Sequence, residues 1–392
     1  MTGIRRVSDL GTTGASSIVD GSIQAVDIAA NAITQDKLST DVPLSGFRNK
    51  IINGDMRINQ RGASTGGFAY LVDRWIMYAG SSLTSLNTST DAPAGFTNSI
   101  YAECTTASGP ASYHGIVQLI EGNNIADLGF GTAWAKPVVV SFWVKSTKTG
   151  VANFSFANNG NLRTYTTTYT IDVANTWEKK IIYITGDTSG TWLTTNGMGL
   201  RLWWDLGSST SYNTTANTWV GTDSIRTSSQ THNLTATLNA RLYLTGVQLE
   251  VGSQPTPFEQ RPIGTELQLC QRYYEKSFPV ATTPANGLYS VSTTGTVTYL
   301  DYWVLAMGWI PFAVEKRAIP NMTFYGTSTN NWQAANTDGS WTNFASIGAY
   351  QGTVGIKTKG FGLGIHNNGA NGYNIVGYSR MCRGDWVAES EL

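Results

Sequence analysis

An aliphatic residue stands at every fifth position in the N-terminal part of this chain. This aliphatic ladder consists of Ile18, Ile23, Ile28, Ile33 and Leu38. A step of five turns a side chain by about 500° on an α-helix and reverses its face on a strand, so neither element places the whole ladder on one side. The intervening residues are small or polar and no aromatic residue precedes Phe47, so the segment builds no core of its own. We expect the ladder to form an oligomeric stalk by packing against copies of the same chain, which argues against a free-standing enzyme.

The composition of the chain excludes several functional classes. Its net charge is zero and 13% of its residues are charged, so no basic field attracts nucleic acid or an anionic membrane. No stretch approaches the roughly 18 consecutive apolar residues of a membrane span. Cys104, Cys270 and Cys382 are widely separated and odd in number, which is typical of buried thiols in a protein made in a reducing cytosol. We therefore expect no nucleic-acid partner, no membrane insertion and no disulfide framework.

After Phe47 the sequence alternates between apolar and polar residues. One predicted strand places Val138, Val140, Phe142 and Val144 on a single face. Similar alternation recurs at 169–173, 200–206 and 247–251, and clusters of Gly and Asn separate these runs. Short alternating strands between turns predict a mainly β fold, namely an antiparallel sandwich with one buried face per sheet.

One short helix is expected in the middle of the chain. Thr265 is placed as its N-cap, and Leu267, Cys270 and Tyr274 recur at helical spacing. The predicted helix therefore runs from Thr265 to about Tyr274. We expect Tyr273 and Tyr274, together with Leu267 and Cys270, to pack this helix onto the sandwich or onto the domain that follows.

Prolines and chain length set the expected domain boundaries. At about 100–200 residues per domain, the chain should hold two or three domains. The helix follows Pro255, Pro257 and Pro262, and an aromatic, Gly-rich β region follows the helix. We predict an N-terminal anchor and stalk in 1–46, a β-sandwich in 47–260, and a linker helix with a distal β-domain in 261–392.

Two segments of the sandwich region carry a family resemblance. The first is Ile-Ile-Asn-Gly-Asp-Met-Arg-Ile-Asn-Gln-Arg-Gly at 51–62, followed by Val-Asp-Arg-Trp at 72–75. The second is Val-Gln-Leu-Glu-Val-Gly at 247–252, followed by Thr-Pro-Phe-Glu at 256–259 and Cys-Gln-Arg-Tyr-Tyr at 270–274. Together they resemble the opening and closing strands of jelly-roll domains in tailed-phage fibres and minor structural proteins, over roughly residues 47–276.

This resemblance implies a virion protein that is assembled in the cytoplasm of a bacterial host. The aliphatic ladder is also similar to the repetitive leader of phage fibres, so the resemblance implies a homotrimer attached to other virion proteins through its N-terminus. The β-domains would then lie distally and meet the bacterial surface, with a glycan as the expected partner. Fibres occur on tails and on heads, and the resemblance does not distinguish the two.

The opening motif is also similar to that of carbohydrate-binding modules, which often hold a structural Ca²⁺ near their first and last strands. The resemblance implies Asp55, Asp73 and Glu250 as the oxygen donors, because Ca²⁺ needs several converging carboxylates or carbonyls. A second interpretation needs no metal. In it, Asp55 holds a turn and Asp73 pairs with the adjacent Arg74.

The tryptophan pair at 203–204 suggests a sugar contact. Adjacent residues of a strand face opposite sides, so Trp203 lies on the side of Arg201 and Asp205 if Trp204 faces the core. An aromatic ring beside such polar groups suits a sugar, which offers an apolar face and hydroxyl groups. The alternative is that Trp203 packs under a loop or against a neighbouring subunit.

Two further tryptophans, Trp332 and Trp341, lie in polar segments of the C-terminal region. Loops on a rigid β scaffold commonly carry binding residues, so both are predicted to contact the receptor. The expected function is that of a structural and adhesive virion fibre protein that binds the host surface. The alternatives are a head-decorating fibre without a receptor role and a glycan-cleaving tail spike.

The sequence offers little support for an enzyme. Gly-Ala-Ser-Thr-Gly at 62–66 matches a nucleophile-elbow string, but that elbow requires a buried strand, a helix and a downstream acid and His. Here the flanks are polar and Gly-rich, and no spacing of carboxylates singles out a glycosidase pair. The long regular repeats of a β-helical depolymerase are also missing from the sequence. We therefore expect binding without catalysis and no required cofactor.

Overall fold

The computed structural model describes residues 47–62, 69–79, 83–107, 112–288, 293–299, 304–326, 333–335, 341–343, 346–348, 355–362, 364–366 and 379–392. The chain separates into two compact units, Met1–Ser45 and Gly46–Leu392. The aliphatic ladder lies outside the described residues, so oligomerisation through it stays a prediction.

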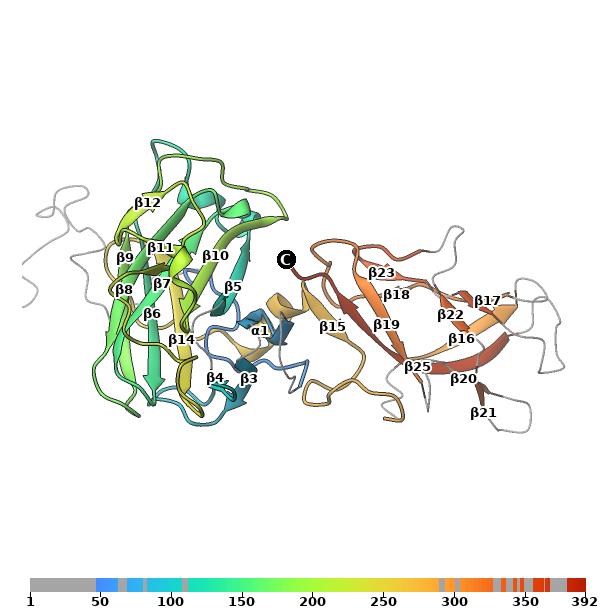
Figure 1. Ribbon diagram of the computed structural model, residues 1–392. Coiled ribbons are helices and arrows are strands. Elements are labelled where there is room, and N and C mark those ends of the chain that lie inside the picture. Colours follow the sequence, from blue (N-terminus) through green and yellow to red (C-terminus); the bar gives the residue numbers. More distant parts are fainter. Residues whose placement is uncertain are drawn as a thin grey trace, which may run out of the picture. The chain divides into compact units, whose positions relative to one another are not determined.

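The described chain is mainly β, as predicted, with two facing antiparallel sheets in its first half (Figure 1). In the described part, the larger sheet has seven strands. Their order is β1 (Ala69–Val72), β2 (Trp75–Ala79), β5 (His114–Glu121), β10 (Met198–Asp205), β7 (Gly150–Ala157), β8 (Thr164–Ile171) and β12 (Thr218–Val220). The second sheet has five described strands, in the order β3 (Leu83–Ser89), β4 (Ser99–Cys104), β14 (Arg241–Val251), β6 (Val138–Ser146) and β9 (Glu178–Ile184).

The core lies between these two sheets and is rich in aromatic rings. The indole of Trp204 is central, with ring centroids 5.7 Å from Trp75, 5.6 Å from Phe142 and 4.9 Å from Phe154. All four side chains are fully buried. The predicted alternation of β6 is confirmed, because Val138, Val140, Phe142 and Val144 all belong to this core.

Short elements connect the strands of the sandwich. They are the 3₁₀ turns η5 (Gly122–Asn124), η6 (Ala126–Leu128), η7 (Asn159–Asn161) and η8 (Thr210–Tyr212), and the parallel pair β11 (Asn213–Thr214) and β13 (Arg226–Thr227). η5 and η6 follow one another in the connection between β5 and β6, which also carries the candidate site described below.

The predicted helix exists but its bounds differ from the prediction. Helix α1 spans Ile263–Gln271 with Pro262 as its N-cap, so the prediction of Thr265 as N-cap was wrong. Proline suits a helix start because its fixed φ fits there and its missing N–H is not needed. The helix also ends before Tyr274, which begins β15 (Tyr274–Lys276).

The helix packs against the opening segment of the sandwich, as predicted. Cys270 and Tyr273 form one buried cluster with Ile52 and Ile58, and Leu267 packs against it. Tyr274 is 6% exposed, and its ring centroid lies 3.9 Å from the guanidinium carbon of Arg61. The two tyrosines therefore join α1 to the segment that carries the first motif.

The remaining strands form a second β region after α1 (Figure 1). They are β16 (Thr293–Tyr299), β17 (Val304–Met307), β18 (Ile310–Pro311), β19 (Asn321–Tyr325), β20 (Gln333–Ala335), β21 (Trp341–Asn343), β22 (Ser346–Gly348), β23 (Gly360–Phe361), β24 (Gly364–His366) and β25 (Ser379–Glu389). β25 pairs with β15, β16, β19 and β20. Among the described residues, no helix is long and apolar enough to cross a membrane.

Candidate binding site

Trp134 presents its indole ring to solvent on the connection between β5 and β6. Its exposure of 85% is the highest among the large hydrophobic side chains of the described residues. Single exposed hydrophobic residues are common on proteins and need no explanation by themselves. Trp134 differs because the backbone that carries it is fixed on both sides.

Hydrogen bonds within the turn fix the backbone next to Trp134. The Thr132 hydroxyl donates to the Gly129 carbonyl at 2.6 Å and accepts from the Trp134 N–H at 3.1 Å. Ala135 N–H donates to the Thr132 carbonyl at 3.2 Å. Gly129 has φ 65°, a left-handed conformation that glycine adopts without strain. The sequence Gly-Phe-Gly-Thr-Ala-Trp therefore forms a closed turn with the tryptophan at its surface.

A second loop holds this turn from the other side. Gly131 N–H donates to the Asp187 carbonyl at 2.7 Å. A Cβ on Gly186 would lie 2.5 Å from the carbonyl carbon of Ala135, so the two backbones approach closely only because residue 186 is glycine. The Asp187 carboxylate is in turn held by two hydrogen bonds from Arg163, at 2.8 and 2.7 Å.

An aromatic base supports both loops. Phe130 and Trp192 meet edge to face at 4.9 Å, and Trp219 lies 5.6 Å from Trp192 and 5.9 Å from Phe130. The indole N–H of Trp219 donates to the Thr185 carbonyl at 2.9 Å. The exposed ring thus stands on a rigid scaffold, which lowers the ordering cost of binding a ligand.

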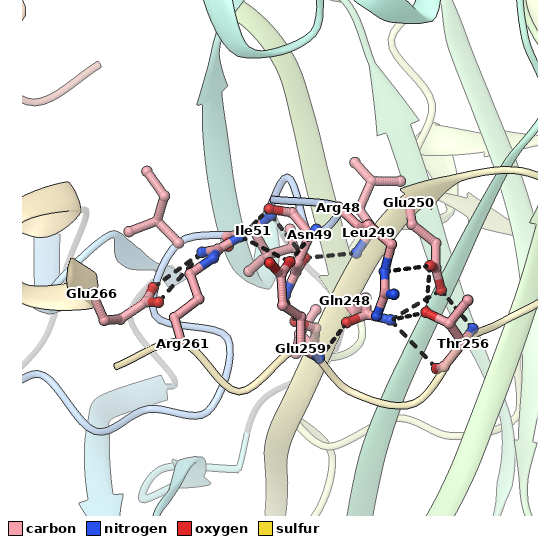
Figure 2. A network of polar contacts seen from close by, with 12 residues as sticks. Arg48, Asn49, Ile51, Gln248, Leu249, Glu250, Thr256, Glu259, Arg261 and Glu266 are labelled. Carbon is pink, nitrogen blue, oxygen red and sulfur yellow. Dashed lines mark hydrogen bonds and ion pairs between the residues drawn. The ribbon is translucent and has the colours of Figure 1, made fainter. Parts of the chain in front are cut away.

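The opening and closing motifs meet in a buried polar network (Figure 2). The Asn49 side chain accepts from the backbone N–H groups of Ile51 and Leu249, both at 3.0 Å, and donates to the Val247 carbonyl at 3.1 Å. Arg261 donates to the Ile51 carbonyl at 3.0 Å and pairs with Glu266 at 3.3 Å. Burial raises the pKa of Glu266, against the effect of Arg261. This network joins two segments about 200 residues apart, and its bonds are internal to the protein.

The three carboxylates predicted as Ca²⁺ donors each bind protein donors instead. Glu250 accepts from the Thr256 N–H at 2.8 Å and from its hydroxyl at 2.6 Å, and Asp55 pairs with Arg57. In the described part of the chain, no group of three or more His, Cys, Asp or Glu side chains is placed to hold a metal ion. Asp55, Asp73 and Glu250 therefore do not converge.

Asp73 also lacks the partner that the metal-free interpretation gave it. Its carboxylate accepts from the N–H of Gln60 at 2.6 Å and from the Gln60 amide at 2.7 Å, while Arg74 pairs with Glu391. Asp73 and Arg74 form the turn between β1 and β2, and their side chains bind different partners. Burial raises the pKa of Asp73 to about 6, although Arg61 and the bonds from Gln60 oppose this.

Trp203 lies on the predicted side of its strand but has no exposed ring face. The Arg201 guanidinium carbon is 5.2 Å from its ring centroid, as expected for residues that share a face. The ring is 1% exposed and contacts Tyr78 at 5.2 Å and Tyr113 at 5.9 Å. Burial of both faces corrects the prediction that Trp203 stacks on a sugar and matches the alternative that it packs under a loop.

The covering loop is the segment between β12 and β14. The Thr164 hydroxyl donates to the Thr222 carbonyl at 2.6 Å, and the Thr166 hydroxyl donates to the Ser224 carbonyl at 3.1 Å. Ile225 then belongs to the same buried cluster as Trp203. The other predicted receptor residues are not tested: Trp332 lies outside the described residues, and so does the side chain of Trp341.

No protein-family model and no curated protein sequence matches the chain. Among solved structures, the enzymatically active domain of tailspike protein 4 of bacteriophage CBA120 is similar over 52% of this chain and 21% of its own, with 12% identity and a TM-score of 0.31. The family 11 carbohydrate-binding module of the cellulosomal cellulase Lic26A-Cel5E of Clostridium thermocellum is similar over 50% of this chain and 98% of its own, with 14% identity and a TM-score of 0.26. The chain spans about a fifth of the tailspike structure. Both TM-scores are low, so neither likeness assigns a function to this chain.

Proposed function

We propose that the chain is a structural and adhesive virion protein of a tailed phage and that it binds a glycan of the bacterial surface. Trp134 is the stacking residue in this proposal. The observation that carries it is an indole 85% exposed on a turn that is held by Thr132 within and by Asp187 from the next loop. The resemblance of the two motif segments to phage fibre domains supports the virion part.

A glycan suits this site better than a deeply buried ligand would. The ring offers a flat apolar face for the C–H groups of a pyranose, and the fixed turn needs no ordering on binding. One such contact gives weak affinity. Several copies on one particle raise avidity by a factor of about 10²–10⁴ through effective concentration.

Binding without cleavage is favoured at this site. Glycosidases need two carboxyl groups on opposite sides of the scissile bond. The carboxylate that anchors the second loop, Asp187, is 2% exposed and bound by both arms of Arg163, so it does not reach a ligand on Trp134. A glycan-cleaving spike therefore stays the alternative that an assay for new reducing ends would detect.

The test is binding of the full-length protein to an array of purified bacterial surface polysaccharides. We expect the Trp134→Ala variant to lose about 2 kcal/mol of binding free energy, or roughly 30-fold in affinity, with unchanged thermal stability. Leu238→Ala is the matched control, because Leu238 is an exposed hydrophobic residue (56%) outside the turn. Unchanged binding by Trp134→Ala, with loss in a Trp332→Ala/Trp341→Ala variant, would move the receptor site to the C-terminal region. Binding to no polysaccharide would favour a fibre without a receptor role.

A further inference from the structure

A groove of about 470 Å³ lies beside the first motif, lined by the opening segment, the η5–η6 connection and α1. Its volume falls within the range of about 300–1,000 Å³ that is usual for small-molecule sites. Its lining includes Phe47, Lys50, Asn123, Asn124, Asp127 and Arg261. The connection between β5 and β6 thus supplies one wall of the groove as well as Trp134.

The aromatic wall of the groove is accessible and its cation is fixed. Phe47 is 66% exposed, and the Arg261 guanidinium carbon lies 5.5 Å from its ring centroid. The network of Figure 2 holds Arg261 through the carbonyls of Asn49 and Ile51. The Nε of Arg261 is buried, so a ligand in the groove does not reach this nitrogen, and Arg261 serves to hold the groove wall.

The charges in the groove are already paired. The Lys50 ammonium lies 2.8 Å from both carboxylate oxygens of Asp127, and Arg261 pairs with Glu266 at 3.3 Å. A charged ligand would have to break one of these pairs. A neutral ligand with hydroxyl groups would keep them. The Asn124 amide offers both donors and acceptors, and the Asn123 amide keeps an acceptor and a second N–H beside the one that donates to Glu121 at 2.9 Å.

We propose that this groove binds one or two neutral saccharide units, with Phe47 as the stacking ring and the amides of Asn123 and Asn124 as hydrogen-bonding partners. The inference rests on the proposed function, that the chain binds a glycan, and adds a second subsite of defined chemistry. This subsite is separate from Trp134, because Trp134 does not line the groove.

The experiment is saturation-transfer NMR of the full-length protein with millimolar methyl glycosides of glucose, galactose, mannose and N-acetylglucosamine. Phe47→Ala removes the aromatic wall at an exposed position, and Leu238→Ala, at an exposed position outside the groove, is the matched control. Trp134→Ala reports separately on the site of the proposed function. We expect a bound glycoside whose affinity falls about tenfold in Phe47→Ala, equal to about 1.4 kcal/mol, and is unchanged in Leu238→Ala. A uronic acid glycoside should bind more weakly than its neutral counterpart.

Each other outcome overturns the inference. Loss of binding in Trp134→Ala alone would reject the groove and uphold the proposed function. Binding that neither Phe47→Ala nor Trp134→Ala changes would reject both sites, and no transfer from any glycoside would reject the groove. A change of association state in Phe47→Ala, measured by sedimentation, would assign the groove to a protein contact instead.

Discussion

Arg272 donates to both carboxylate oxygens of Glu121, at 2.8 and 2.6 Å, and so ties the end of α1 to the end of β5. The Tyr273 hydroxyl donates to the same carboxylate at 2.8 Å. Burial raises the pKa of Glu121, but the bonds from Arg272 and Tyr273 outweigh it and leave the pKa lowered. The side chain of Glu121 is 1% exposed, and Arg272 is 31% exposed. One buried carboxylate thus fixes the helix on the sandwich.

Replacing this carboxylate should destabilise the protein. The Asn123 amide also donates to Glu121, at 2.9 Å. In Glu121→Gln the amide cannot accept from all four donors, so buried donors lose their partner at a cost of about 1–3 kcal/mol. Urea unfolding followed by tryptophan fluorescence measures the change. The matched control is Glu103→Gln, whose partner Arg241 has a side chain that is 41% exposed, and which should cost less than about 1 kcal/mol. Equal losses in the two variants would contradict a structural role for the Glu121 contact.

The stability of the protein should also decrease as pH rises from about 4 to 6. Asp73 is fully buried and its pKa is raised from 3.8 to about 6. A carboxyl group whose pKa is raised in the folded state stabilises that state below the unfolded pKa. This stabilisation is lost as the pH rises through the pKa of the folded state. The free energy of unfolding falls by about 3 kcal/mol in total.

The variant Asp73→Asn isolates this effect. It cannot ionise, so the decrease between pH 4 and 6 should become smaller by the Asp73 contribution. Burial also raises the pKa values of Glu266 and Asp205, so their contribution should remain, as should the loss of stability below pH 4 from groups such as Glu121. Unfolding free energies measured at several pH values in both proteins test this. A decrease of the same size in Asp73→Asn would assign it to another group.

The sequence predicted the β-sandwich but not the exposure of its aromatic residues. Alternation placed Trp204 in the core and Trp203 on the opposite face correctly, because strand period is local. Whether that opposite face is covered depends on the segment that carries Ile225, about 20 residues further on. No local sequence pattern indicates a contact between residues this far apart. The burial of Trp203 therefore could not be predicted from the sequence.

The sequence around Trp134 contains a local sign of the candidate site, although the alternation of apolar and polar residues does not reveal it. Trp134 lies between Ala133 and Ala135 and shortly before Pro137, in a segment with two glycines. This composition is typical of a tight turn, and the two adjacent side chains are too small to cover an indole. The anchoring by Asp187, by contrast, joins residues 56 positions apart (131 and 187) and appears only in the fold. For the same reason the sequence could not show that Asp73 and Arg74 bind different partners.

Gly186 lies close to the Trp134 turn. A substitution there tests whether glycan binding needs the fixed turn as well as the exposed indole. Gly186→Ala places a methyl group 2.5 Å from the carbonyl carbon of Ala135, so the turn must move at a cost of about 1–3 kcal/mol. Glycan binding should fall although Trp134 is intact, as an array measurement and a thermal melt would show together. Gly221→Ala is the control, because its nearest neighbour is 3.9 Å away. Full binding by Gly186→Ala would mean that the fixed turn is not needed.

The aliphatic ladder of the N-terminal segment is predicted to set the association state of the protein. Ile18, Ile23, Ile28, Ile33 and Leu38 should hold the chain in a homotrimer, with each buried side chain contributing about 1.5–3 kcal/mol per chain. In Ile23→Asp/Ile28→Asp, two charges replace buried aliphatic groups, so sedimentation should detect dissociation to monomers while the far-ultraviolet spectrum of the β-sheets stays unchanged. Gln24→Asp places a charge between two ladder positions and should leave the trimer intact, which separates loss of apolar contact from charge repulsion. A wild-type chain that sediments as a monomer at micromolar concentration would rule out the ladder as an oligomerisation element, and the avidity proposed for glycan binding would then require another source of multivalency.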